Sequence, residues 1–149
     1  MDFKMWVLQG HYRGERNFSF SDLKSAKTRR LNWRNQIAKT YQTDIKSTIS
    51  TKQILEAVSD NLNSPKAFSL VDNHELSFKD WQFIDELFGL QLIQDSPDLS
   101  ATQKNLISAR QTARQAKDYV KSDQIRDALL RDGIVLNDST SETTWSYNA

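Results

Sequence analysis

Helix-breaking residues are scarce in this chain, and that scarcity constrains its fold more than any other feature. Its 149 residues include only four Gly and two Pro. Apolar residues recur three and four positions apart over most of the length, which is the spacing of one face of an α-helix. The sequence therefore predicts a mainly α-helical protein, with strand signals confined to its two ends.

The longest predicted helix begins at Ser19 or Ser21, whose hydroxyl can cap the free backbone N–H groups, and runs to about Tyr41. Residues 3–12 before it are short, aromatic and apolar, and they fit either a strand or the last turns of a helix. The predicted buried face of the long helix comprises Leu23, Ala26, Trp33, Ile37 and Tyr41.

Three shorter helices are expected next. One spans about residues 50–58. Pro65 suits the first turn of the following helix, because its missing N–H would be unpaired there in any case. Ser77 is positioned to cap a third helix that ends near Gly89. Together with the long helix, these segments predict a helical bundle.

A polar stretch at residues 94–100 contains the second Pro and lacks apolar periodicity, so we place a domain boundary there. Beyond it the sequence predicts helices over 101–117 and 119–132. The segments 134–136 and 143–147 then predict a β-hairpin. The C-terminal part is thus expected to be a small α+β module.

The sequence contains few residues in arrangements that could support catalysis. There is no Cys, which excludes a disulfide, a thiolate nucleophile and a Cys-based zinc site. His11 and His74 lie in different segments without metal-ligand spacing, so structural or surface roles are expected for both. Neither a Gly-rich phosphate loop nor a nucleophile–base pairing is recognisable. The residues alone therefore do not predict an independent enzyme or a metal or cofactor site.

Hydropathy and net charge indicate where the protein is located and whether the whole chain attracts nucleic acid. The apolar stretch Trp6–Leu8 is far below the roughly 20 residues that a membrane span needs, so we expect a cytoplasmic protein without membrane association. The net charge of +1 gives no overall attraction to nucleic acid. Any prediction of RNA binding must therefore rest on where the basic residues lie.

The predicted helix after residue 100 carries a basic stripe. Its members follow i, i+4, i+7 and i+11 spacing, which fits contact with a phosphate backbone or an ordinary solvated surface. Tyr119 offers a ring for stacking of an unpaired base, or an aromatic that packs on the core. The stripe comprises Arg110, Arg114, Lys117 and Lys121.

Three charged residues follow on the next predicted helix. Asp123, Arg126 and Asp127 fit either a surface ion-pair ladder or a set of groups that reads base edges. Trp145 is expected to be a core residue that holds the hairpin on the last helix.

As an ordered string, these segments closely resemble the C-terminal anticodon-binding region of cysteinyl-tRNA synthetases, because both order and spacing agree. Two earlier segments resemble the same family, in the stretch after its catalytic signature loop and in its helical bundle. The similar segments are 8–13 with 17–19, then 60–67, 113–119, 122–129, 133–138 and 143–145.

The resemblance implies a class I synthetase helical bundle of the DALR type, followed by a small α+β module that reads a GCA anticodon. Residues 1–18 would be a remnant of the catalytic or stem-contact region, 19–94 the bundle and 95–149 the anticodon-binding module. Carried over by position, the implied anticodon contacts are Arg114, Tyr119, Asp123, Arg126 and Asp138. Lys117 and Arg110 are further RNA-binding candidates, and Lys27, Arg30 and Arg34 are weaker ones.

The family's HIGH-like motif, KMSKS-like loop and zinc ligands would lie upstream of residue 1, and none occurs here. We therefore expect tRNA binding without catalysis, with ATP and zinc used by a catalytic half that acts in cis or in trans. Residues 139–142 also lack the Pro and Gly usual in this turn. That departure and the near-neutral charge favour an alternative, a free-standing helical adaptor that binds a protein. The implied anticodon contacts argue against this alternative.

Overall fold

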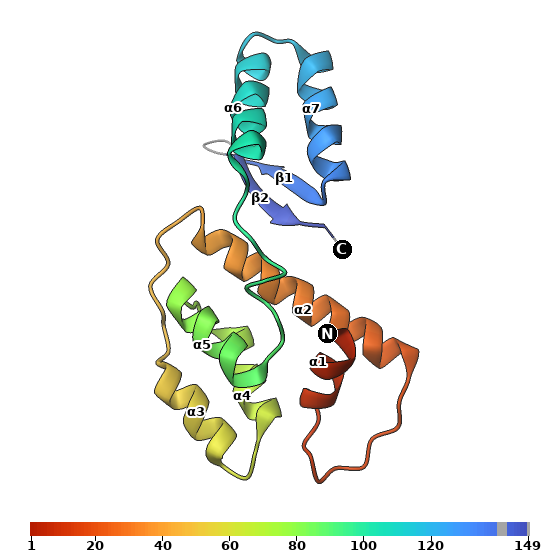
Figure 1. Ribbon diagram of the computed structural model, residues 1–149, viewed down its shortest axis with the longest axis vertical. Helices are drawn as coiled ribbons and strands as arrows, with labels where there is room; N and C mark the ends of the chain where they lie inside the picture. Colours follow the sequence, from red (N-terminus) through yellow and green to blue (C-terminus); the bar gives the residue numbers. More distant parts are fainter. Residues whose placement is uncertain (140–142, 149) are drawn as a thin grey trace. The chain divides into compact units, whose positions relative to one another are not determined.

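The computed structural model describes residues 1–139 and 143–148 of the chain. These residues form seven α-helices and one pair of antiparallel strands (Figure 1). The expected fold class, mainly α with a small C-terminal α+β module, is confirmed. The chain divides into two compact units, Met1–Ser96 and Pro97–Ala149. The predicted boundary, between 94 and 95, lies two residues before this division.

The first unit is entirely helical in its regular structure. Its ambiguous N-terminal segment is a helix, and residues 1–18 belong to the same compact unit as the bundle. Helix α1 packs against α2, and α3 packs against α4. The bounds are α1 Asp2–Leu8, α2 Phe20–Thr40, α3 Thr51–Ser59, α4 Ser64–Asn73 and α5 Phe78–Phe88.

Side-chain caps fix where these helices begin. The Ser19 hydroxyl accepts from the Asp22 N–H at 3.0 Å. Ser50 forms a capping box at the start of α3, and Ser77 caps α5. Pro65 lies in the first turn of α4, as predicted. Local polar chemistry thus sets the helix starts before any tertiary contact is made.

Large aromatic rings fill the core of the first unit. The Trp33 ring centroid lies 4.8 Å from that of Phe68 and 5.8 Å from that of Trp81. The Trp33 indole N–H donates to the Asp72 carboxylate at 2.6 Å, so its polar group is satisfied although the ring is buried. The predicted face of α2 is confirmed, with Ala26, Trp33 and Ile37 buried and Leu23 and Tyr41 packed against the core.

The second unit is a helical hairpin followed by a strand hairpin. Leu136 pairs with Trp145 in the ladder, and both side chains are buried with Leu129 of the second helix. The first strand extends two residues further than predicted. Its elements are α6 Ala101–Gln115, α7 Tyr119–Arg131, β1 Ile134–Asp138 and β2 Thr143–Tyr147.

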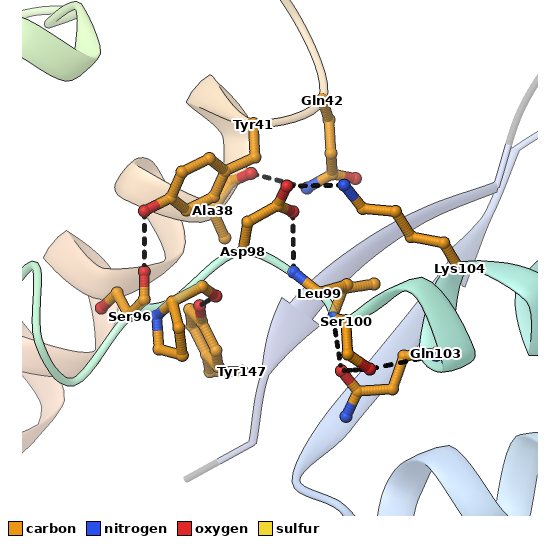
Figure 2. A network of polar contacts seen from close by, with 11 residues as sticks. Ala38, Tyr41, Gln42, Ser96, Asp98, Leu99, Ser100, Gln103, Lys104 and Tyr147 are labelled. Carbon is orange, nitrogen blue, oxygen red and sulfur yellow. Dashed lines mark hydrogen bonds and ion pairs between the residues drawn. The ribbon is translucent and has the colours of Figure 1, made fainter.

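Polar contacts fix the start of α6. Ser100 and Gln103 form a reciprocal capping box, and Lys104 reaches back to Asp98 at 2.6 Å (Figure 2). The Tyr147 hydroxyl donates to the Pro97 carbonyl, which ties the end of β2 to the residues before α6. Within the part of the chain that the structure describes, no helix combines the length and apolar character needed to cross a membrane.

Candidate nucleic-acid interface

The Asp138 carboxylate, at the end of β1, is the centre of a polar cluster. Arg110 of α6 donates to its two oxygens at 2.8 and 2.7 Å. Arg114, one turn later on α6, also donates to it, and the Thr143 hydroxyl donates at 2.8 Å. A carboxylate has about four acceptor sites, so these four bonds occupy it fully.

Burial and charge reinforce this cluster. The Arg110 side chain is 4% exposed, and that of Asp138 is 30% exposed. The hydrogen bonds from Arg110 hold the pKa of Asp138 well below its usual range, against the opposing effect of burial. In return, the bond to Asp138 raises the pKa of Arg110, and the negative charge of Asp123 adds to this effect. Both groups are therefore charged at neutral pH.

This geometry separates the roles of three predicted site residues. Arg110 is buried and Asp138 has no acceptor site left, so neither is placed to meet a base directly. Arg114 differs, because its side chain is 46% exposed and only one of its guanidinium N–H groups has a partner among the described residues. Arg110 and Asp138 thus fix the position of Arg114, which retains donors for a ligand.

Three other predicted residues form an exposed stripe on α7. Tyr119, Asp123 and Arg126 stand at i, i+4 and i+7 and therefore share one helical face. All three are exposed, and Tyr119 is 62% exposed, so it does not pack on the core. Within the described ranges, no ion pair joins Asp123 or Arg126 to another side chain, which argues against the ladder interpretation. The stripe presents an aromatic ring, an acceptor and a donor to solvent.

Lys117 lies in the turn between α6 and α7 and not on the α6 face. Helix α6 ends at Gln115, two residues earlier than predicted, and Lys117 adopts a left-handed backbone with φ 58°. The Asp118 N–H donates to the Ala113 carbonyl at 2.8 Å, and the Lys117 N–H donates to Arg114 at 3.0 Å. This pair of bonds is a Schellman motif, which usually has Gly at the left-handed position. The prediction that Lys117 continues the stripe of Arg110 and Arg114 is therefore wrong.

The three basic residues of α2 that are weaker RNA-binding candidates differ in whether they are paired within the fold. Arg30 pairs with Asp95 and lies 3.6 Å from Asp2, while the Arg34 Nε donates to the Asp95 carbonyl at 2.9 Å. These two arginines therefore hold the segment around residue 95 on α2. Lys27 is exposed and is the better placed of the three weaker candidates for contact with a phosphate.

A polar cavity of about 590 Å³ also opens on the first unit. It is lined mainly by α2, including Arg29 and Lys39, with Asp72 from the end of α4. The Arg29 Nε lies 3.1 Å from Asp72, and the Asp72 carboxylate neutralises part of the positive charge of Arg29. Among the described residues, no group of three or more His, Asp or Glu is placed to hold a metal ion.

Comparisons with known proteins agree with the resemblance seen in the sequence. Residues 96–145 match the family described as cysteinyl-tRNA ligase anticodon binding domain. Cysteine–tRNA ligases match nearly the whole chain. That of Rhodopseudomonas palustris is 33% identical over 95% of the chain and 31% of its own length. Those of Campylobacter fetus and Treponema denticola are 30% and 29% identical over 95% and 97% of the chain, and 37% and 38% of their own lengths.

The sequence of the second unit is thus similar to that of an anticodon-binding class of domain. The resemblance to cysteinyl-tRNA synthetases is confirmed over nearly all of the chain, which spans about a third of the length of the curated relatives it matches.

Proposed function

We propose that this chain is the tRNA-binding part of a cysteine–tRNA ligase and that its second unit recognises a GCA anticodon. The observation that carries the proposal is the exposed stripe of Tyr119, Asp123 and Arg126 on α7, within the segment that matches the anticodon-binding family. Folded RNA loops are recognised through unstacked bases, which need a stacking surface and groups that pair with base edges. The stripe supplies both.

Each residue of the stripe has a distinct role in this proposal. Tyr119 stacks on one anticodon base, which contributes about 1–3 kcal/mol in comparable contacts. Asp123 accepts from an exocyclic amino group, which guanine, cytosine and adenine all carry. Arg126 and Arg114 donate to ring nitrogen or carbonyl acceptors of the neighbouring bases. The base that is accepted at each point then depends on where each side chain lies along the stripe, and not on charge alone.

Arg110 and Asp138 act as positioning residues. Arg110 bonds to both carboxylate oxygens of Asp138, and this contact fixes where Arg114 can bond to the same carboxylate. The Arg114 guanidinium is therefore already in position before RNA binds. Lys117 and Lys121 flank Tyr119 and neutralise backbone phosphates. Lys27 makes a weaker backbone contact from the first unit.

The chain supplies recognition in this proposal, and another part of the enzyme performs the chemistry. Joining cysteine to tRNA with ATP, and selecting the thiol with zinc, belong to a catalytic half that works with this chain in cis or in trans. The proposed setting is the cytoplasm.

A titration with two RNAs tests the proposal. One tRNA carries the GCA anticodon, and the other differs from it in one anticodon base. Both are titrated at fixed low and moderate salt with wild-type chain, with Arg126→Ala and with Arg131→Ala. Arg131 is an exposed arginine in the last turn of the same helix, outside the stripe, and so provides a matched control for lost charge.

We expect the wild type and Arg131→Ala to prefer the GCA tRNA by at least about tenfold, and Arg126→Ala to lose most of that preference. Equal, salt-sensitive binding of both tRNAs by the wild type would contradict anticodon recognition. No binding at all would favour the adaptor alternative.

A further inference from the structure

The buried face of the strand hairpin ends in a polar pair. Side chains alternate along a strand, so Leu136 and Asp138 share one face of β1, and Thr143 and Trp145 share one face of β2. Leu136 and Trp145 are opposite each other in the ladder, and both are buried. Asp138 and Thr143 are the next pair on that face and the last pair of the ladder. Thr143 is thus a hydroxyl residue that continues an apolar face.

The Thr143 hydroxyl completes the set of donors around the Asp138 carboxylate. It donates to Oδ1 at 2.8 Å, and Arg110 donates to the same oxygen at 2.8 Å. The other oxygen, Oδ2, accepts from Arg110 at 2.7 Å and from Arg114. Each carboxylate oxygen offers about two acceptor sites. Thr143 and Arg114 therefore fill the remaining site on each oxygen that Arg110 already contacts.

Packing does not require a hydroxyl at this position. Val has nearly the shape of Thr and an equally high preference for strands, and Thr143 is only half-buried. The Asp138 side chain is 30% exposed, so water can reach the carboxylate and replace a lost hydroxyl donor. We therefore expect Thr143→Val to fold. The hydroxyl then matters for the geometry around Asp138 more than for stability.

We propose that Thr143 is a positioning residue for anticodon discrimination, an inference that rests on the proposed function. Its hydroxyl occupies the free site on Oδ1, so the Arg114 guanidinium bonds at Oδ2 and is held in one place. Without the hydroxyl, Asp138 gains an acceptor site for the exocyclic amino group that guanine, cytosine and adenine all carry. An acceptor that several bases can use lowers the discrimination between anticodons.

The electrostatics of the cluster provide a way to observe the Thr143 bond. Hydrogen bonds from Arg110 have the largest effect in holding the pKa of Asp138 below its usual range, against the opposing effect of burial. The bond from the Thr143 hydroxyl lowers the pKa of Asp138 further. Loss of that hydroxyl should therefore raise the pKa of Asp138, and loss of a hydroxyl elsewhere on β2 should not.

The test compares Thr143→Val and Thr143→Ser with the wild-type chain. Val removes the hydroxyl and keeps the shape, whereas Ser keeps the hydroxyl. Thr144→Val is the matched control, because Thr144 lies on the opposite face of β2 and its hydroxyl donates to the Asn137 carbonyl at 3.4 Å. Urea titrations check that all the variants fold. Each protein is then titrated with the GCA tRNA and with a tRNA that differs in one anticodon base.

We expect Thr143→Val to reduce the preference for the GCA tRNA from at least about tenfold to within about threefold. Thr143→Ser and Thr144→Val should keep the preference of the wild type. Discrimination by Thr143→Val equal to that of the wild type would overturn the proposal. An equal loss in Thr144→Val would also overturn it, because the effect would then not depend on the bond to Asp138.

NMR of the chain without RNA separates this proposal from the proposed function. The guanidinium signals of Arg114 should shift in Thr143→Val, and titration of the Asp138 carboxyl carbon should give a raised pKa. Both should stay at their wild-type values in Thr143→Ser and Thr144→Val. Unchanged Arg114 signals in Thr143→Val would contradict the role of Thr143, whatever the tRNA titrations show. Shifted signals, together with equal binding of both tRNAs by the wild type, would contradict the proposed function only.

Discussion

Arg110 of α6 and Asp138 of β1 face each other through two parallel hydrogen bonds of 2.8 and 2.7 Å, although 28 residues separate them in the sequence. The contact joins the helical hairpin to the strand hairpin. Because Arg114 and Thr143 bond to the same carboxylate, the contact also fixes where the half-exposed Arg114 lies. Stability of the second unit and placement of Arg114 should therefore depend on the same pair.

Replacing Arg110 with Met should destabilise the second unit by about 2 kcal/mol. Met keeps much of the aliphatic volume but leaves Asp138 without its bidentate partner, and partial exposure of Asp138 reduces the cost below that of a fully buried pair. A urea titration followed through the NMR signal of the Trp145 indole reports on this unit. Arg131→Met is the control, and a midpoint for Arg110→Met equal to that of the control would contradict a structural role for the pair.

Stability of the second unit should fall in acid because of Asp138. Its pKa is lowered on folding from an ordinary value of 3.8, so ionised Asp138 stabilises the folded state above that value. The contribution is lost as pH falls from about 4 toward the folded-state pKa.

Urea midpoints from the same indole signal, measured at about pH 7 and at about pH 2.5, one above and one below the ordinary pKa, check this expectation. Asp138→Asn should be less stable than the wild type at neutral pH, and the difference should shrink in acid. A constant difference at both pH values would show that ionisation of Asp138 does not carry the effect.

Lys117→Gly should stabilise the second unit by roughly 0.5–1 kcal/mol, because Gly adopts the left-handed backbone of Lys117 without steric cost. If Lys117 contacts phosphate as proposed, the same change should weaken tRNA binding and reduce its salt dependence by about one ion. Thermal unfolding and salt-dependent titrations measure the two effects. A destabilised variant would contradict the Schellman geometry.

Tyr119→Ala should leave stability within about 0.5 kcal/mol of the wild type, because the side chain is mostly exposed. Its tRNA affinity should fall by about 1–3 kcal/mol, whereas Tyr119→Phe should keep most of it, since the ring provides the stacking. Equilibrium binding with the GCA tRNA measures both variants. Equal losses for Ala and Phe would assign the contact to the hydroxyl group and not to stacking.

The helices were largely predictable because their signals are local. Ser19 and Ser77 sit where a hydroxyl can meet free N–H groups, and the three- and four-residue spacing of Ala26, Trp33 and Ile37 marks one helical face. The segment of α1 was ambiguous, because seven residues are too few to separate a helix from a strand by periodicity.

The candidate site was less predictable because its geometry depends on distant partners. Helical spacing placed Arg110 and Arg114 on one face, but it could not show that a carboxylate 28 residues away buries one and leaves the other half-exposed. The end of α6 was missed because Lys117 stands where Gly usually marks a helix end. Base-contact roles for Arg114, Tyr119, Asp123 and Arg126 stay predictions, and the 139–142 turn lies largely outside the described residues.

The most direct test of the central proposal maps an anticodon stem-loop with the GCA sequence onto the ¹⁵N-labelled chain by NMR. The account predicts that the largest chemical-shift changes fall on the α6–α7 turn and the exposed face of α7, at Lys117, Tyr119, Asp123 and Arg126, with the Arg114 guanidinium also perturbed. A stem-loop with one anticodon base changed should produce smaller changes at the same residues. Changes confined to the first unit, or identical for both stem-loops, would contradict anticodon recognition by this surface.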